Sequence, residues 1–525
     1  MGIYLNPGNE NFKMMISGDI YVDKTMMISA INRYIDKGNK YVCVSRPRRF
    51  GKTMAGNMLS AYYSKGCESR DLFSGLKISG EPGFLDKLNK YNVIKLDMNS
   101  EYQNTYDKER LIRNITDEIK AEMAEQFPDV PIRADDTLAR SILRVHAKTG
   151  ETFIMIMDEY DVLVREKAPE KLFDEYLSFL NGLFKSDTLR PAISLAYLTG
   201  ILPVVRDKVQ SKLNNFYEYT MIDAEELAEF IGFTSDEVIE LCNEHKLDYE
   251  ECKLWYDGYY QRGIEIYNPE SVVKCTNKKS FAGYWGMTSS YEVISEKLKE
   301  NYNGIKDVVV NMLSGESVSV DPGMYLNTVD GFYRRDEALS YLIHLGYLAF
   351  DIDSRTCFIP NKEVRMEWER AISILPEYSV TNRIIKESMG LLSDTLNGDC
   401  EAVARALDES HVHVTSNRSY NNEDALQSAI YLAYIYALNE YTVIREMTSG
   451  KGFADVVYIP VHKGRPAMII ELKRNSSPES AIDQIRRKNY HDSLKHYQGE
   501  LLFVGINYDE KEKSHECRIE RFVKE

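Results

Sequence analysis

The chain has 525 residues, a length that predicts about two to four domains of ordinary size. Its 65 Lys and Arg against 81 Asp and Glu give a formal net charge of −16, which argues against a protein that coats nucleic acid by bulk charge. No apolar run approaches the ~20 residues that span a bilayer, no secretion signal is visible and the 8 cysteines include no C-x-x-C pair, so we expect a cytoplasmic protein with no membrane partner, disulfide framework or common zinc site.

The first third of the chain alternates strand and helix patterns, beginning around a candidate phosphate-binding loop. A β-branched run at 40–45 predicts a buried strand, a helical stretch follows at 54–63, and Gly-Lys-Thr occupies 51–53. In this context backbone N–H groups and the helix dipole attract an anion. We expect Lys52 to reach the β- and γ-phosphates of ATP, and the Thr53 hydroxyl to bind Mg²⁺.

The loop departs from the general motif at its first position. The pattern G-x-x-x-x-G-K-[ST] asks for Gly at position 46, where this chain has Arg46. From these residues alone, a basic strand-to-helix turn that binds no nucleotide stays an alternative.

A pair of acids follows another strand candidate. The apolar run at 152–157 ends in Asp158 and Glu159. An apolar strand that delivers two acids is typical of a Walker B element, in which Asp158 would hold Mg²⁺ and Glu159 would act as general base on the attacking water. A strand-end Asp that caps an ordinary turn is the alternative, but two elements in the right order favour an ATPase.

Two further strand candidates end in polar residues. Residues 92–96 lead to Asp97, and residues 193–198 lead to Thr199. Ligands bind beyond the carboxyl ends of strands in an open parallel sheet, so Thr199 could read the γ-phosphate, although a plain Thr-Gly turn explains it equally well. Arg206 follows shortly after and is a candidate phosphate contact, in cis or in trans.

Four motifs in order give this region a family resemblance. They are YVDKT (21–25), SRPRRFGKT (45–53), MDEYD (157–161) and TGILPVVRDKVQSKLNN (199–215). Together they resemble the bacterial AAA-ATPase-like family, in which the arginine-rich loop is the usual Walker A form. The resemblance implies a P-loop domain that binds ATP with Mg²⁺, but it assigns no role to YVDKT. The candidate nucleotide-binding residues are Arg48, Arg49, Gly51, Lys52, Thr53, Asp158, Thr199 and Arg206, with Glu159 as catalytic base and with Thr53 and Asp158 as Mg²⁺ ligands.

The middle of the chain is less informative and mostly helical in pattern. Residues 223–233 and 235–245 show helical spacing with acidic first turns. A helix candidate at 337–346 leads into a hairpin that ends near residue 361, which could form a winged-helix-like unit. Such a unit can bind DNA or only pack on the ATPase region, and its charge does not decide between the two.

The last fifth of the chain contains a second group of charged residues. Strand candidates at 453–459 and 467–473 flank a Gly-containing turn and predict a hairpin. If the hairpin is centred near residue 463, Asp455 pairs with Glu471. Two carboxylates would then lie side by side on neighbouring strands.

This hairpin predicts a metal site with a lysine beside it. Strand alternation puts Lys473 on the same face as Glu471. Like carboxylates repel unless a cation joins them, and Mg²⁺ or Mn²⁺ prefers such oxygen ligands. The ion can activate water for attack on a phosphodiester bond, while Lys473 orients or deprotonates that water. A surface salt bridge of Lys473 with its acidic neighbours is the alternative.

The same residues match the D…E-x-K signature. GFADVV (452–457), IIELK (469–473) and IDQIRRKNY (482–490) resemble the PD-(D/E)XK nuclease-like domain that often ends these ATPase chains. The basic residues at 486–488 could hold phosphates or form a solvated helix face. The implied metal ligands are Glu423, Asp455 and Glu471, and the implied catalytic residues are Asp455, Glu471, Lys473 and Gln484.

Charge and pattern together divide the chain into three regions. Residues 421–525 carry 15 Lys and Arg and 16 Asp and Glu, a net charge of 15 − 16 = −1, so nearly all of the acidity lies elsewhere. We expect an α/β protein with a P-loop parallel sheet covered by helices on both faces at 1–222. A mostly helical region that could include a winged-helix unit is expected at 223–400, and a restriction-endonuclease-like α/β domain at 401–525.

The favoured function is an ATPase coupled to a metal-dependent nuclease that acts on nucleic acid, with DNA as the expected partner. DNA processing, mobile-element activity and defence all fit. The alternative is a nucleotide-dependent switch or scaffold whose nuclease-like domain binds nucleic acid without cleaving it. The intact site residues disfavour a non-catalytic interaction protein. A homo-oligomer with an arginine acting in trans is compatible with the sequence, which carries no dedicated signal for it.

Overall fold

The computed structural model describes most of the chain. The described residues are 2–203, 215–287, 291–299, 304–324, 332, 334–415, 423–449, 452–461, 464–487, 494, 497 and 499–522. They fold into two compact units. Unit 1 contains Met1–Leu241, Tyr259–Asn277 and Val320–Cys357, and unit 2 contains Cys242–Gly258, Lys278–Ser319 and Phe358–Glu525. The three-part division at 222 and 400 stays a prediction.

Unit 1 is built on a five-stranded parallel sheet with the order β2-β3-β4-β1-β5. Three of the strands, β1, β3 and β4, are buried along their whole length, as expected of parallel strands covered on both faces. The four sequence-predicted strands are confirmed, and the short β5 was not predicted. The strands are β1 (Tyr41–Ser45), β2 (Asn92–Asp97), β3 (Phe153–Asp158), β4 (Ile193–Gly200) and β5 (Tyr217–Tyr219).

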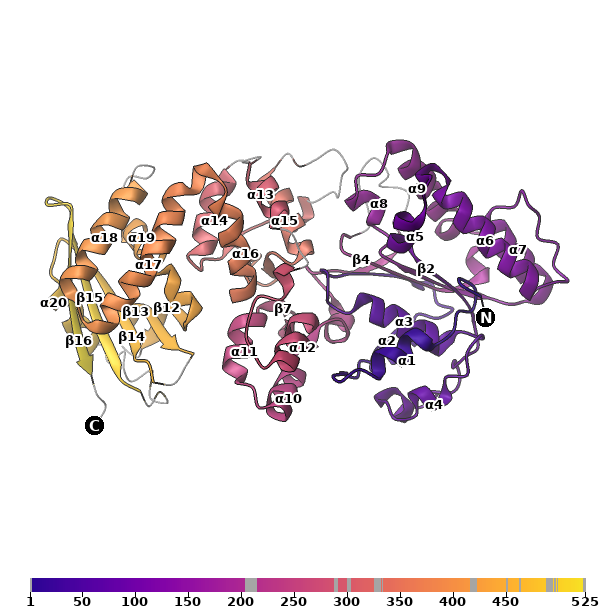
Figure 1. The fold of residues 1–525 in the computed structure, drawn as a ribbon, viewed down its shortest axis with the longest axis horizontal. Helices are drawn as coiled ribbons and strands as arrows, with labels where there is room; N and C mark the ends of the chain where they lie inside the picture. Colours follow the sequence, from indigo (N-terminus) through magenta and orange to yellow (C-terminus); the bar gives the residue numbers. More distant parts are fainter. Residues whose placement is uncertain are drawn as a thin grey trace. The chain divides into compact units, whose positions relative to one another are not determined.

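Helices cover both faces of this sheet, with α1 and α3 on one side and α6, α7 and α9 on the other (Figure 1). Cys43, Met155 and Leu198 point into the core formed with α6, α7 and α9. Ile156, one position along from Met155, faces α3, where its Cγ2 lies 3.6 Å from the position of a Cβ built on Gly56. The helices are α1 (Glu10–Ile16), α2 (Met26–Asn32), α3 (Lys52–Tyr63), α4 (Arg70–Phe73), α5 (Met98–Asn104), α6 (Leu111–Gln126), α7 (Leu138–Thr149), α8 (Val162–Arg165) and α9 (Glu170–Phe184).

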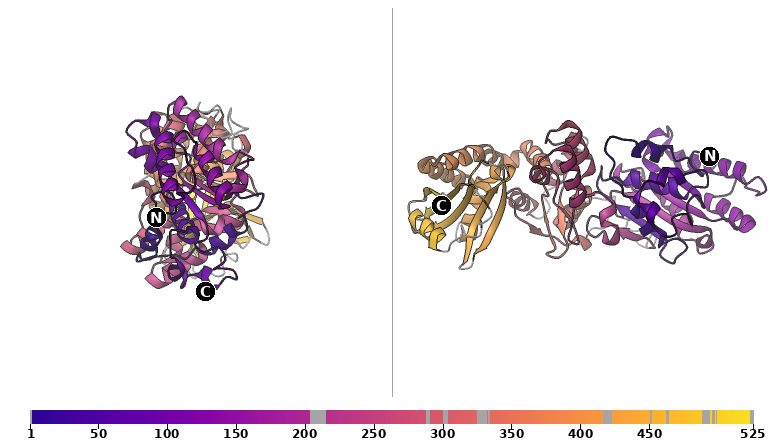
Figure 2. Two further views of the ribbon diagram at one scale, coloured as in Figure 1. Left: turned by 90° about the vertical axis from the view of Figure 1, so that its right-hand side faces the viewer. Right: turned by 90° about the horizontal axis from the view of Figure 1, so that it is seen from below.

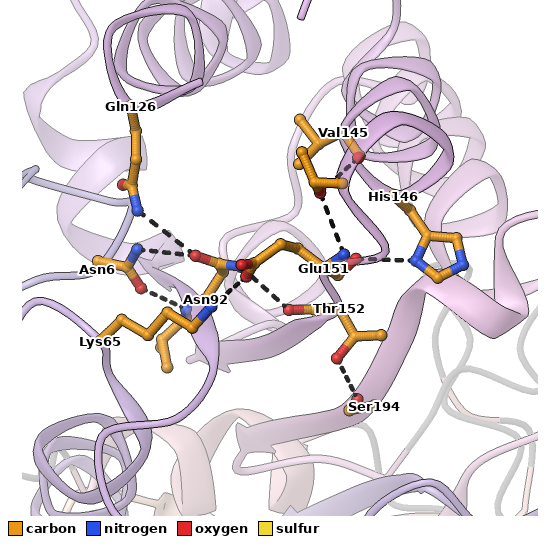
Figure 3. Close-up of polar contacts among 11 residues, drawn as sticks. Asn6, Lys65, Asn92, Gln126, Val145, His146, Glu151, Thr152 and Ser194 are labelled. Atoms are coloured by element: carbon orange, nitrogen blue, oxygen red, sulfur yellow. Dashed lines mark hydrogen bonds and ion pairs between the residues drawn. The ribbon is translucent and has the colours of Figure 1, made fainter. Parts of the chain in front are cut away.

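A polar network fixes the amino ends of the strands (Figure 3). Asn92 at the start of β2 donates to Glu151 Oε2 over 2.6 Å, and Glu151 also pairs with Lys65. Asn92 Oδ1 accepts hydrogen bonds from Asn6 at 3.2 Å and Gln126 at 3.4 Å. These contacts tie the N-terminal segment to the sheet. This network occupies the amino ends of the strands. Ligands of open parallel sheets bind at the opposite, carboxyl ends.

The remainder of unit 1 contains a small antiparallel sheet of order β6-β8-β7. The predicted helix at 223–233 is wrong: a 3-10 turn at Glu225–Phe230 is followed by strand β6. Gly232 explains the break, because its φ of 112° ends the helix and a Cβ there would lie 2.3 Å from Ile266 of β8. The predicted helix at 235–245 and the helix-to-hairpin unit at 337–361 are confirmed. These elements are β6 (Phe233–Thr234), α10 (Ser235–His245), β7 (Tyr259–Gln261), β8 (Ile264–Tyr267), α12 (Pro269–Lys278), α15 (Arg335–Leu345), β10 (Ala349–Asp351) and β11 (Thr356–Phe358).

Unit 2 ends in a mixed five-stranded sheet of order β12-β13-β14-β15-β16. β14 and β15 run parallel because helix α20 crosses over between them, and the other neighbours are antiparallel. The strands and the crossover helix are β12 (Tyr441–Ser449), β13 (Gly452–Pro460), β14 (Ala467–Arg474), α20 (Pro478–Arg487), β15 (Leu501–Asp509) and β16 (Ser514–Phe522). The preceding elements of this unit are α11 (Tyr249–Tyr256), α13 (Glu292–Lys299), α14 (Ile305–Leu313), β9 (Val318–Ser319), α16 (Lys362–Ser373), α17 (Ser379–Asn397), α18 (Cys400–Thr415) and α19 (Glu423–Ala433).

Alternation along β14 separates two cores in unit 2. Met468 and Ile470 pack with α17, α18 and α19 on one face of the sheet. Ile469 packs with Ile482 and Ile485 of α20 on the other face. Figure 2 shows the helices stacked against the strands of this sheet. Glu471 and Lys473 share the parity of Ile469, so both belong to the face that α20 covers.

Candidate nucleotide and metal sites

The phosphate-binding loop of unit 1 has the backbone that its sequence predicts. Gly51 precedes α3 with a left-handed φ of 94°, and Lys52 is the first residue of the helix. The Lys52 side chain is only 5% exposed, and its Nζ donates to the carbonyl of Pro47 over 2.9 Å. Burial lowers the pKa of Lys52, and the nearby carboxylates of Glu159 and Asp158 only partly offset it. A buried cation at a helix N-terminus suits an incoming polyphosphate.

The residue that replaces the first glycine of the general motif has a structural role. The buried guanidinium of Arg46 donates to the carbonyl of Thr220 over 2.6 Å and to that of Ser45 over 3.3 Å. Burial lowers the pKa of Arg46 to about 10. Arg46 therefore ties the loop to the chain just after β5, and its departure from the general motif leaves the rest of the loop intact.

The two acids and Thr199 meet at the carboxyl ends of neighbouring strands. β4 lies between β1 and β3, so Thr199 stands between the phosphate-binding loop and the acidic pair. Its hydroxyl donates to Asp158 Oδ1, which also accepts the backbone N–H of Glu159 at 3.0 Å. Glu159 has a φ of 51°, a strained value for a residue with a Cβ, and strain of this kind gathers at functional sites.

Sequence reasoning missed an arginine in this site. Arg165, the last residue of α8, pairs through Nη2 with Glu159 and through Nε with Asp161 Oδ2 at 3.2 Å. Burial lowers the pKa of Arg165, but the two carboxylates outweigh it and raise the pKa above its ordinary value. The i,i+4 spacing of Asp161 and Arg165 is the signal that could have indicated the second pair.

Part of this site lines a cavity of about 710 Å³, whose described lining does not include Asp158 or Thr199. Arg48, Arg49, Gly51, Lys52 and Thr53 of the loop line it together with Glu159 and Arg165. A second side of the wall is apolar and comes from the N-terminal segment and from residues after β5. This side includes Phe12, Ile20, Tyr21, Met27, Phe230, Phe233 and Val273. Cavities of a few hundred cubic ångströms with one polar and one apolar wall are typical of small-molecule sites.

The YVDKT segment, which the sequence left without a role, forms part of this wall. Tyr21 and Lys24 line the cavity. Asp23 accepts hydrogen bonds from the N–H and hydroxyl of Thr25, at 2.8 and 2.6 Å, and from the N–H of Lys77 at 2.7 Å. Lys24 Nζ reaches Glu237 at 2.5 Å. The segment thus holds the wall together with short polar contacts.

One sequence candidate falls outside this description. Arg206 is not among the described residues, so its phosphate contact stays a prediction. Arg49, which lines the cavity, has a φ of 73° and pairs with Glu270 of α12 at 3.6 Å. Sequence reasoning did not anticipate Glu270 beside the phosphate-binding loop.

The second candidate site lies on the α20 face of the unit 2 sheet. Glu471 is 1% exposed, and its Oε1 accepts hydrogen bonds from Lys473 Nζ at 3.2 Å and from Gln484 of α20. Val456 pairs with Ile470 in the β13–β14 hairpin, which is the register expected from the sequence up to that pair. The pairing of Asp455 with Glu471, one residue further, stays a prediction. The side chains of Asp455 and Glu423 lie outside the described part of the structure.

A glycine allows α20 to reach Glu471. Gly505 of β15 pairs with Glu471, and a Cβ on Gly505 would lie 2.3 Å from the carbonyl of Pro478. Close approach of α20 therefore requires glycine here. Next to it, Asn507 pairs with Lys473 and accepts the N–H of Ser476 at 2.9 Å, which fixes the turn into α20. Neither role is visible in the local sequence pattern.

The donor chemistry of this site fits a hard divalent cation. Glu471 offers buried carboxylate oxygens, and oxygen donors of this kind are preferred by Mg²⁺ and Mn²⁺. Within the described side chains, no group of three or more His, Cys, Asp and Glu is close enough to hold a metal ion. A full set of ligands would therefore need side chains beyond these, such as those of Asp455 and Glu423.

Comparisons with known proteins match two regions of the chain. Residues 7–210 match the model of the predicted AAA-ATPase family, and residues 421–517 match that of the PD-(D/E)XK nuclease superfamily. A curated relative, the uncharacterized protein in the vnfD 5′ region of Azotobacter chroococcum mcd 1, is 26% identical over 306 residues. The match covers 56% of this chain and 55% of the relative, so the chain spans about half the length of that protein.

Solved structures give weak overall superpositions. The Aeropyrum pernix ORC2 protein, solved as ADPNP-ADP complexes, is 9% identical and has a TM-score of 0.24, covering 68% of this chain and 97% of that one. The Aeropyrum pernix ORC1 protein in complex with DNA is 10% identical, with a TM-score of 0.26 and coverages of 87% and 94%. Caenorhabditis elegans PCH-2 is 13% identical, with a TM-score of 0.21 and coverages of 48% and 55%.

The architecture and the family models lead to one conclusion. A parallel sheet with a phosphate-binding loop forms unit 1, and a mixed sheet with a D…E-x-K hairpin ends unit 2. Among the helices that the structure describes, none has the length and apolarity required to cross a membrane. The chain is therefore similar to the predicted AAA-ATPase family over residues 7–210 and to the PD-(D/E)XK nuclease superfamily over residues 421–517.

Proposed function

We propose that unit 1 binds and hydrolyses ATP with Mg²⁺, and that unit 2 carries a Mg²⁺- or Mn²⁺-dependent nuclease acting on nucleic acid, with DNA as the favoured substrate. The observation that carries the ATPase is the convergence of Lys52, Thr53 and Glu159 on one cavity at the carboxyl ends of the strands. The nuclease rests on the placement of Glu471, Lys473 and Gln484 on one sheet face.

The residues that the sequence predicted for the first site divide the work of ATP hydrolysis. Lys52 exchanges the Pro47 carbonyl for phosphate oxygens, and the N–H groups at the start of α3 contact the same phosphates. Thr53 and Asp158 would hold Mg²⁺, which neutralises phosphate charge when it is bound. Glu159 accepts the proton of the attacking water. Arg48 and Arg49 lie on the cavity wall, where they add positive charge.

The residues of the second site divide the work of phosphodiester cleavage. Glu471 and Asp455, with Glu423 from α19, would hold a divalent ion that lowers the pKa of a bound water. Lys473 lies 3.2 Å from Glu471 and orients or deprotonates that water. Gln484 holds the Glu471 carboxylate from α20.

The ATPase is tested by two substitutions with opposite effects on binding. Lys52→Ala should abolish ATP binding, because it removes the buried cation. Glu159→Gln should retain binding and trap ATP, because only the base is lost. Lys148→Ala, a change of exposed lysine on α7, is the matched control. Ordinary turnover in both site variants would contradict the proposed ATPase.

The nuclease is tested with single- and double-stranded DNA and RNA, with Mg²⁺ or Mn²⁺ and with or without ATP. Asp455→Ala and Lys473→Ala should stop cleavage. Arg474→Ala is the control, since the adjacent Arg474 pairs with Glu510 at 2.9 Å on the strand end. Cleavage that survives both site changes would exclude this site. Binding of DNA without cleavage by the wild type would favour the switch or scaffold.

We also propose that the protein acts in the cytoplasm and that ATP occupancy controls the nuclease. Dependence of cleavage on ATP in the same assay, lost in Lys52→Ala, would support the coupling. Light scattering with and without ATP measures whether the chain forms a homo-oligomer.

A further inference from the structure

Arg165 is a buried cation in the proposed nucleotide site that the roles above leave unused. Its side chain is 8% exposed and lines the same cavity as Lys52 and Glu159. It comes from the short helix α8, which directly follows the acidic pair in the chain. Buried guanidinium groups are costly unless they are paired, so the position of this one is informative.

The guanidinium is fixed at its inner end. Arg165 Nε lies 3.2 Å from Oδ2 of Asp161, which is fully buried. The same oxygen accepts the N–H groups of Ile201 at 3.0 Å and Leu202 at 2.8 Å, just after β4. Asp161 thus ties Arg165 to the end of the sheet. The outer nitrogen, Nη2, is left to point toward Glu159.

This contact engages the carboxylate that is proposed to act as the base. A charge-assisted hydrogen bond between a guanidinium and a carboxylate fixes the orientation of both groups. Glu159 pairs with Arg165, just as Lys52 donates to the Pro47 carbonyl. Lys52 and Arg165 therefore both contact acceptors of the protein itself, which a triphosphate can replace.

We propose that Arg165 is the arginine of this ATPase that contacts the γ-phosphate in cis, and that by doing so it releases Glu159. This inference rests on the proposed ATP hydrolysis. The water oxygen forms a bond to the γ-phosphorus, the bridging P–O bond breaks with its electron pair going to ADP, and Glu159 takes the water proton. Arg165 balances the charge on the transferred phosphoryl group.

The first test separates binding from turnover. In Arg165→Ala, kcat should fall about 10²–10³-fold, the usual cost of losing one charge-stabilising donor. The Kd for ADP should stay unchanged, while the preference for a non-hydrolysable ATP analogue over ADP is lost. Arg165→Lys should recover part of the kcat and part of the preference for the ATP analogue. Arg113→Ala, on the exposed face of α6 where Arg113 pairs with Asp117 at 3.6 Å, should behave as wild type.

The second test separates cis from trans action. Lys52→Ala chains, which bind no ATP but keep Arg165, are mixed with Arg165→Ala chains. An arginine that acts in cis gives no recovery of turnover in the mixture. Recovery would overturn the proposal, as would wild-type kcat or wild-type ATP preference in Arg165→Ala.

The two proposals fail in different ways. Absence of ATP turnover in the wild type would overturn the proposed hydrolysis. The loss of ATP preference in Arg165→Ala, read by equilibrium binding, would still support the γ-phosphate contact.

Discussion

Thr199 and Asp158 are joined by a hydrogen bond from hydroxyl to carboxylate, across the ends of two neighbouring parallel strands. Both side chains are buried, at 1% and 3% exposure. The contact is available because β4 lies between the strand of the phosphate-binding loop and the strand of the acidic pair. Thr199 therefore orients the carboxylate that is proposed to hold Mg²⁺.

Replacing Thr199 by Val should reduce ATP turnover more than ATP binding. The substitution leaves a buried carboxylate without one donor, which costs about 1–3 kcal/mol and corresponds to roughly 10–100-fold in rate when it falls on the transition state. Steady-state kinetics with titrated Mg²⁺ should show a lower kcat and a higher Mg²⁺ concentration at the half-maximal rate. Thr199→Ser, which keeps the hydroxyl, should stay near wild type, and a Val variant with unchanged kcat would remove Thr199 from the site.

Lys52→Met should stabilise the nucleotide-free protein while abolishing its response to ATP. Burial lowers the pKa of Lys52, so the folded state disfavours its charged form. In the pH window between this lowered pKa and the ordinary value of about 10.4, the unfolded chain binds more protons and the free energy of unfolding rises with pH. Thermal denaturation should show this rise in the wild type and its loss in Lys52→Met. A lower melting temperature for Lys52→Met at pH 7 would show that the neighbouring acids outweigh burial.

Lowering the pH should reduce the stability of unit 2, because His515 becomes protonated. This histidine on β16 is 5% exposed, and Asp408 of α18 accepts hydrogen bonds from its backbone N–H at 2.7 Å and its Nδ1 at 2.9 Å. Burial lowers the pKa of His515 below its ordinary value of 6.5, against the influence of Asp408. The stabilisation is complete above pH 6.5 and is lost as the pH falls from there toward the lowered pKa.

The loss from His515 can reach at most about 1.4 kcal/mol per pH unit for one proton. Urea denaturation at pH 7.5 and pH 5.5 measures it, with His515→Gln as the variant that lacks the titrating group. On acidification the free energy of unfolding should fall more in the wild type than in His515→Gln. Parallel pH profiles would exclude His515 as the source.

Gly505→Val should separate α20 from the unit 2 sheet. The new side chain meets the Pro478 carbonyl, a backbone group that cannot move without the helix. We expect a loss of about 1–3 kcal/mol in stability and a fall in nuclease activity beyond the fall in folded protein, because Gln484 leaves Glu471. Gly390→Ala is the matched control, since Gly390 lies inside α17 with no atom near its Cβ position and should gain about 0.5–1 kcal/mol. Full activity in Gly505→Val would show that α20 does not position the site.

The features that could be predicted from the sequence depend on residues that are close together in the chain. The phosphate-binding loop follows directly on β1, and Asp158 ends β3 with Glu159 next to it, so an apolar run and a short motif locate them. The register of the β13–β14 hairpin up to Val456 and Ile470 depends only on the turn between two adjacent strands.

The remaining features depend on contacts between distant segments or on the direction of a side chain. Arg46 turns away from the loop toward Thr220, and Arg165 folds back onto Glu159. Gly505 acquires its role only when β15 pairs with β14 after the crossover. Gly232 reads as part of a helical pattern until Ile266 of β8 lies against it. Periodicity along the chain carries no signal for such contacts.

Helix α12 joins the phosphate-binding loop to the exit of the chain from unit 1. It begins beside the loop, where Glu270 pairs with Arg49 at 3.6 Å, and it ends at Lys278, where the chain passes into unit 2. A polyphosphate and Glu270 would compete for the same guanidinium, which is already partly exposed. Occupancy of the loop would then replace the Arg49 contact of Glu270 and change the contacts at the first turn of α12, which is part of the cavity wall.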